Sequence, residues 1–128
     1  MQSEEASATR QQSHEKEKHM VLVTIRMLVL PKKHDEALRI LRSTAEWSRV
    51  KQGCLSSRIY EDVQEDNVLM FEEIWRSEED LEYHLRSDAY QNVLLVLEMA
   101  RKQPEIRFDT ISSSTGIERI EKARGHAR

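Results

Sequence analysis

The sequence has 128 residues, of which 38% are hydrophobic and 34% are charged, with only three glycines and two prolines. This length fits one domain with a single core, and the balance is typical of a globular protein that contains helices. The same numbers argue against a membrane protein, because no apolar run approaches the roughly 20 residues that a spanning helix needs. The formal net charge of -3 argues against a nucleic-acid-binding protein, since such proteins usually carry a basic surface.

The N-terminus lacks the apolar stretch and the small-residue cleavage pattern of a signal peptide. Cys54 is the single cysteine of the sequence, so it cannot form an internal disulfide. Both features predict a cytoplasmic protein. The neighbouring sequence offers Cys54 no helix N-terminus or cation that would lower its pKa, so we expect a small packed residue.

The two ends of the chain differ in composition from the middle. Residues 1–19 contain no Leu, Ile, Val, Phe, Tyr or Trp and are crowded with Gln, Ser, Glu and Lys. Such a segment cannot bury enough apolar surface to offset its ordering entropy, so we predict that it is disordered. Residues 116–128 carry four Lys/Arg and two Asp/Glu, which is typical of a solvated basic tail. The predicted domain is therefore residues 20–115.

The domain begins with a strand and a helix. Residues 20–30 are apolar in both alternating positions, which predicts a strand covered on both faces and ended by Pro31. From Lys32 the period changes, because apolar side chains recur at helical spacing up to Val50. Gly53 then follows as a C-terminal stop.

Two short apolar runs, residues 54–60 and 68–75, are separated by a polar stretch and predict a β-hairpin. Ser77, followed by three acidic residues, is a typical N-cap for a second helix. An apolar stripe predicts that this helix continues as far as Pro104. Residues 106–111 predict the last strand.

The element order is therefore β-α-β-β-α-β, an α+β class with an antiparallel four-stranded sheet and both helices on one face. The other face of the sheet also needs a cover, because Leu22, Leu28 and Leu30 point away from the helices. A second copy of the chain, packed sheet against sheet, provides that cover, so we predict a homodimer.

Three motifs resemble those of the antibiotic biosynthesis monooxygenase family, which includes quinol monooxygenases. Gly53 leads into the second strand, Glu73-Ile74-Trp75 ends the third, and Leu81-Glu82-Tyr83-His84-Leu85 follows in the second helix. The resemblance implies a ferredoxin-like monomer that pairs through its sheet into a dimeric α/β barrel. It also implies a pocket between sheet and helices. Oxygenating members of the family act on phenols or quinols without flavin, haem or metal.

The sequence departs from the family pattern at two positions. Asp88 stands where many members have a second histidine, four residues beyond His84. Leu94 aligns with the essential histidine of the haem-degrading branch, so haem degradation is not expected.

His84 is the candidate catalytic residue, because an inward histidine on the apolar stripe can accept a phenolic proton near neutral pH. Trp75 and Glu73 are expected to shape a substrate pocket, with Tyr60 and Tyr90 as weaker members. Tyr90 is included because residues 83, 90, 94 and 97 form a second stripe on the predicted helix. The structural alternatives are a core histidine bonded to Glu73 or to a strand carbonyl, a core or interface tryptophan, and an ion-paired carboxylate.

No metal site or other cofactor is predicted. The remaining histidines (His14, His19, His34 and His126) are scattered in polar segments without ligand spacing, and the glycines form no phosphate loop. The first functional hypothesis is a cofactor-independent monooxygenase whose partner is a small quinol or phenol. An isomerase-like enzyme on the same scaffold and a non-catalytic binding or accessory dimer are the alternatives.

Overall fold

The computed structural model describes residues 19–125. Four strands form one antiparallel sheet in the order β2-β3-β1-β4. The strands are β1 (Met20–Leu28), β2 (Cys54–Glu61), β3 (Val68–Trp75) and β4 (Glu105–Ile111). The helices are η1 (Pro31–Lys33), α2 (His34–Arg49), α3 (Glu78–Leu85), η2 (Asp88–Tyr90), α4 (Gln91–Leu97) and α5 (Ile117–Ala123). The predicted α+β fold is therefore confirmed, whereas the predicted disorder of residues 1–19 falls almost entirely outside the described residues.

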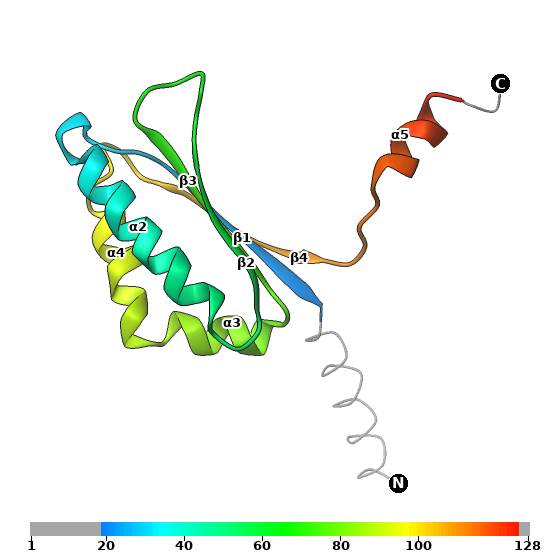
Figure 1. The fold of residues 1–128 in the computed structure, drawn as a ribbon, viewed down its shortest axis with the longest axis horizontal. Coiled ribbons are helices and arrows are strands. Elements are labelled where there is room, and N and C mark those ends of the chain that lie inside the picture. Colours follow the sequence, from blue (N-terminus) through cyan, green and yellow to red (C-terminus); the bar gives the residue numbers. More distant parts are fainter. Residues whose placement is uncertain (1–18, 126–128) are drawn as a thin grey trace, which may run out of the picture.

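Figure 1 shows α2, α3 and α4 gathered on one side of the sheet, with α2 and α4 side by side. The buried face of α2 carries small residues at helical spacing, among them Ala37, Ala45 and Ser48, around a fully buried Leu41. Small side chains let the helix backbone approach the sheet closely, and Leu41 fills the space between them. The apolar spacing of the sequence therefore builds this layer.

The second predicted helix is wrong in its continuity, because it is broken into α3, η2 and α4. The break follows Leu85. The Ser87 side chain donates to the His84 carbonyl oxygen at 2.6 Å, and the Ser87 N–H donates to the same oxygen at 3.0 Å. A serine that captures the carbonyl of a preceding turn competes with helix continuation. The stripe predicted through residues 83, 90, 94 and 97 does not exist as one face, since Tyr83 and Leu94 are exposed.

The strand that enters the hairpin contains an irregularity that decides which side chains face the helices. Cys54 pairs with Trp75 and Ser56 pairs with Ile74, so the register shifts by one residue between them. A β-bulge of this kind reverses the facing of every residue that follows it. As a result Ser57 lies beside Glu73 on the helix side.

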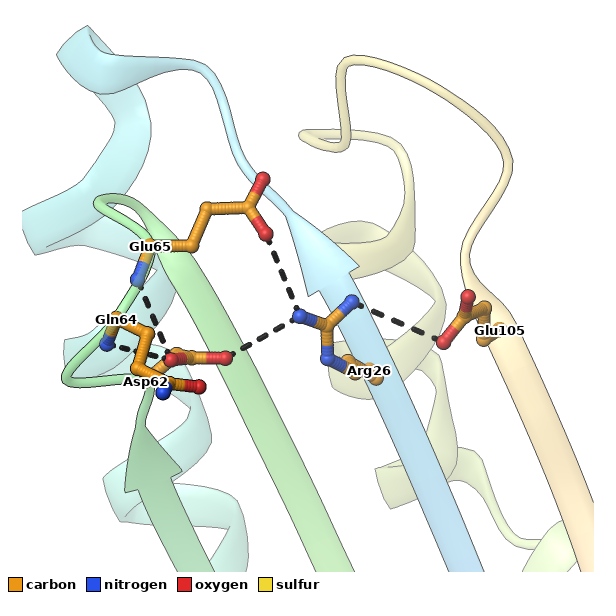
Figure 2. A network of polar contacts seen from close by, with 5 residues as sticks. All are labelled: Arg26, Asp62, Gln64, Glu65 and Glu105. Carbon is orange, nitrogen blue, oxygen red and sulfur yellow. Dashed lines mark hydrogen bonds and ion pairs between the residues drawn. The ribbon is translucent and has the colours of Figure 1, made fainter.

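The face of the sheet away from the helices carries a polar network around Arg26 (Figure 2). One guanidinium nitrogen of Arg26 donates to Asp62 at 3.2 Å and to Glu65 at 3.4 Å, and the other lies 3.8 Å from Glu105. The Asp62 carboxylate also accepts from the backbone N–H groups of Gln64 and Glu65, and chiefly the Gln64 bond, followed by Arg26, lowers the pKa of Asp62. These exposed pairs add little stability, but they fasten the β2–β3 loop to the outer face.

The segment after β4 departs from a simple solvated tail, since residues 117–123 form the helix α5. Figure 1 shows α5 standing beyond the end of β4, away from the helical layer. Its side chains Ile117 and Ile120 are exposed. No helix in the described part of the chain is long and apolar enough to cross a membrane.

Candidate functional site

Glu73, Trp75 and His84 meet in the interior, where the end of β3 passes under α3. Trp75 is completely buried, Glu73 is 2% exposed and His84 is 5% exposed. Residues two apart on a strand share a face, so Glu73 and Trp75 both point toward the helices. His84, in the last turn of α3, packs against the same two residues. The motif residues found in the sequence are therefore brought together by the fold.

The Glu73 carboxylate is held by two hydrogen bonds. Its Oε2 accepts from the Ser57 hydroxyl at 2.7 Å, and its Oε1 accepts from the Trp75 indole N–H at 3.1 Å. Because both carboxylate oxygens have a donor, the side chain is fixed in position. The bulge in β2 is what supplies Ser57 to this network.

His84 is packed by aromatic rings but lacks hydrogen bonds. Its ring stacks on Trp75 with centroids 4.5 Å apart and meets Tyr90 edge to face at 5.5 Å. Neither ring nitrogen has a hydrogen-bond partner among the described residues. The Nε2 atom lies 3.7 Å from Glu73 Oε1, which is too long for a hydrogen bond but close enough for an ion pair once the ring is protonated. The predicted bond from His84 to Glu73 or to a strand carbonyl is thus absent.

Burial lowers the pKa of His84 below its ordinary value, Glu73 acts in the opposite direction, and Lys51 lowers it further. The neutral ring is therefore the form that the folded protein favours near pH 7. A neutral imidazole can accept a proton, and the carboxylate beside it then stabilises the imidazolium that results. The arrangement suits a proton acceptor.

The other two titrating groups near the carboxylate are held in their protonated forms. Burial, with a smaller contribution from Glu73, raises the pKa of Tyr90 to about 12. The same two causes raise the pKa of Cys54 to about 11. The expectation of an unreactive cysteine agrees with this environment.

A surface pocket of about 250 Å³ opens beside His84 and Trp75. One wall comes from Lys51 and Gln52, in the connection between α2 and β2, and another comes from α3 and the turn after it. The lining residues are Lys51, Gln52, Trp75, Glu79, Asp80, Tyr83, His84 and Ser87. This volume is near the lower end of small-molecule sites.

Gly53 joins the two walls of the pocket. Its φ of +87° is in the left-handed region, and a Cβ built there would collide with the Asp80 side chain. The Gly53 carbonyl oxygen also accepts from the Arg76 N–H at 2.7 Å. Asp80 in turn accepts from the Arg76 guanidinium, at 2.9 and 3.1 Å, and from the Ser77 hydroxyl at 3.1 Å. Only glycine fits this approach without displacing one wall.

Three sequence-predicted pocket residues stand apart from the cavity lining. Glu73 is buried and bonded to Ser57 and Trp75, and it is not among the lining residues. Tyr90 meets the His84 ring edge to face but does not line the pocket. Tyr60 is not brought to the site, because the bulge turns it to the outer face, where its hydroxyl donates to Glu72 at 3.4 Å. Sequence reasoning missed Lys51 and Gln52; their place just before Gly53 was the available signal.

Within residues 19–125, no three His, Cys, Asp or Glu side chains gather in an arrangement that could hold a metal ion. The expectation of a cofactor-free site stays a prediction.

The fold is shared with many solved structures. A conserved protein from Methanosarcina mazei matches with a TM-score of 0.68 at 24% identity, over 76% of this chain and 97% of that one. A protein from Mycobacterium tuberculosis matches with a TM-score of 0.69 at 21% identity, over 76% and 99%. A structure described as an antibiotic biosynthesis monooxygenase matches with a TM-score of 0.66 at 19% identity, over 73% and 99%. At these identities the likeness concerns the fold.

Comparison of sequences identifies the family as well as the fold. An uncharacterized protein from Synechocystis is 31% identical over 86 residues, which are 67% of this chain and 54% of the relative, so the chain spans about half the length of that protein. The sequence model of the antibiotic biosynthesis monooxygenase family matches residues 20–94, from the first strand through Glu73, Trp75 and His84. The chain therefore belongs to the antibiotic biosynthesis monooxygenase family.

Proposed function

We propose that this protein is a cofactor-independent monooxygenase that acts on a quinol or another small phenol. The observation that carries the proposal is the buried His84, with two unpartnered ring nitrogens, beside a pocket of about 250 Å³. Such a reaction needs a residue that accepts the phenolic proton and an aromatic surface that orients the substrate ring.

The proposed reaction begins when a ring nitrogen of His84 takes the hydroxyl proton of the substrate. Trp75 orients the aromatic ring, and Glu73, 3.7 Å from the imidazole, stabilises its protonated form. The electron-rich phenolate reduces O₂ and a C–O bond forms at a ring carbon. Loss of the ring hydrogen and cleavage of the O–O bond then give a carbonyl and one water. A quinol and O₂ thus become a hydroxyquinone and water, with all electrons supplied by the substrate.

The test is oxygen uptake with a panel of quinols. We expect about one O₂ per substrate with the unaltered protein, and a loss of roughly 100-fold or more in His84→Ala, the usual range for a general base. His34→Ala is the matched control, because His34 begins α2 and pairs with Glu61 away from the pocket. Unchanged turnover in His84→Ala removes this histidine from the mechanism, and turnover without oxygen favours an isomerase-like reaction instead.

We also propose that two copies pair through the outer face of the sheet. On that face the half-buried side chains of Leu22 and Ile74 lie opposite each other, and Met70 adds apolar surface beside the polar network of Arg26. A sheet packed on a sheet removes such apolar surface from water. Light scattering after size exclusion should give twice the chain mass of 15.1 kDa, and Ile74→Arg should shift it toward one chain. A monomeric unaltered protein contradicts the pairing.

A further inference from the structure

The pocket wall formed by the connection after α2 contains one cation whose role the fold does not explain. Lys51 follows α2, is half-buried and lines the pocket together with His84 and Trp75. Among residues 19–125 it forms no ion pair with a carboxylate. A structural lysine would normally be paired or fully solvated.

The Lys51 ammonium is positioned by an aromatic ring. Its Nζ lies 5.0 Å from the centre of the Trp47 ring, one helical turn earlier in the chain. A cation over an aromatic face keeps its donors available, because the ring accepts no conventional hydrogen bond. Lys51 is therefore held at the pocket with its N–H groups free for another acceptor.

The acidic residues of the pocket leave room for an anion at this wall. Asp80 is paired with the Arg76 guanidinium and also accepts a hydrogen bond from the Ser77 hydroxyl. Glu79 also lines the pocket, from α3, and it forms no ion pair with Lys51. No carboxylate that lines the pocket is therefore paired with the Lys51 ammonium, and a ligand that is anionic at one end can supply the missing partner.

We propose that the pocket binds small acidic phenols as their anions, with the phenolate oxygen on Lys51 and the ring between Trp75 and Tyr83. This inference rests on the proposed function and names the form in which its substrate is held. His84 receives the proton that the phenol releases, and Lys51 stabilises the oxygen left behind. Lys51 is then a positioning residue for the reactive anion, the species that would reduce oxygen.

The electrostatics of His84 agree with this division of labour. The groups that face His84 are Glu73 from β3, Tyr90 from η2 and Lys51 from the connection after α2. Lys51 lowers the pKa of His84, so its positive field reaches the space beside the imidazole where the phenol would lie. The same field favours a phenolate over a phenol.

The probe is 4-nitrophenol, whose neutral and anionic forms absorb at different wavelengths, so its ionisation can be followed without any turnover. Bound to the unaltered protein, its titration midpoint should fall by about one pH unit, which corresponds to roughly tenfold tighter binding of the anion. Lys51→Met should abolish that shift, and Lys51→Arg should restore most of it. The neutral ether 4-nitroanisole should bind equally to all three proteins.

Three results overturn the inference: an unshifted midpoint with the unaltered protein, the same shift in Lys51→Met, or an equal loss of 4-nitroanisole binding in that variant. The last would mean that Lys51 only supports the pocket. The outcome is independent of oxygen chemistry. If the midpoint shifts but no oxygen is consumed, the binding inference stands and the proposed monooxygenase function fails. If oxygen is consumed but the midpoint does not shift, the proposed function stands and the binding inference fails.

Discussion

The two ends of the helix-covered core share the same strands but differ in the polarity of their buried side chains. At one end, Ile25 and Phe71 of the sheet meet Leu41 and Val93 of the helices in a cluster made of hydrocarbon. At the other end the apolar cluster is small, and the buried polar groups Ser57, Glu73 and His84 lie among its members. The large cluster accounts for stability, and the small one accepts polar groups that a stable core would avoid. A protein of this size can have a reactive end because its other end holds the fold.

The largest effect should come from the hydrocarbon end. Leu41→Ala removes a fully buried side chain and leaves a cavity between α2 and the sheet, so we expect a loss of about 3 kcal/mol in the free energy of unfolding. Urea denaturation measures it. The matched control is Leu55→Ala, since Leu55 is 55% exposed, and its loss should stay below about 0.5 kcal/mol. Similar losses in the two variants would contradict the division of the core.

The next largest effect should come from the carboxylate at the polar end. Glu73→Ala strips the Ser57 hydroxyl and the Trp75 indole N–H of their acceptor, and we expect a loss of about 2 kcal/mol. Glu73→Gln introduces an amide whose single oxygen can still accept from one of the two donors, so it should lose about half of that. If the alanine variant were as stable as the unaltered protein, the buried network would have no structural part.

A smaller effect concerns pH. Burial lowers the pKa of His84 in the folded state, so the unfolded chain binds its proton first as the pH falls. The contribution of His84 is therefore complete above about pH 6.5, the unfolded value, and decreases below it. One group limits the slope to about 1.4 kcal/mol per pH unit. Urea midpoints between pH 5 and 8 should show a flatter profile in His84→Gln; an unchanged profile would assign the pH dependence elsewhere.

The smallest effect is on the alkylation rate of Cys54, which reports the negative charge of Glu73. With a pKa of about 11, the Cys54 thiol should react slowly with iodoacetamide at pH 8. Glu73→Gln removes the second of the two causes of that shift and should speed alkylation by a few-fold, while burial still holds the rate below that of a free thiol. Mass spectrometry over time measures both rates. A slower reaction in the variant would show that access, and not charge, controls the thiol.

The strands could be predicted closely because their signal is local. The hairpin between 54–60 and 68–75 was expected within one residue of its observed bounds, since alternation and the polar turn lie side by side in the sequence. The break after α3 could not be foreseen in the same way. It depends on whether the Ser87 hydroxyl turns back to the His84 carbonyl, and the apolar stripe continues past it regardless.

The site divides along the same line. Glu73, Trp75 and His84 came from a family pattern, and the structure brings them together. Tyr60 was a weaker candidate for the pocket, and the bulge between Cys54 and Ser56 turns it to the outer face instead. Lys51 was missed because its relation to α3 exists only in three dimensions.

Gly53 has a consequence for the range of ligands that the pocket accepts. The two walls touch at this residue, since its missing side chain leaves the space that Asp80 occupies. The distance between the two walls is therefore set by the backbone and does not depend on which side chains line the pocket. Exchanging Gln52 or Tyr83 can alter which chemical groups are preferred inside an opening of fixed width. Admitting a larger ring system would require the connection itself to be rebuilt, so substrate size should change more slowly in descendants of this protein than substrate polarity.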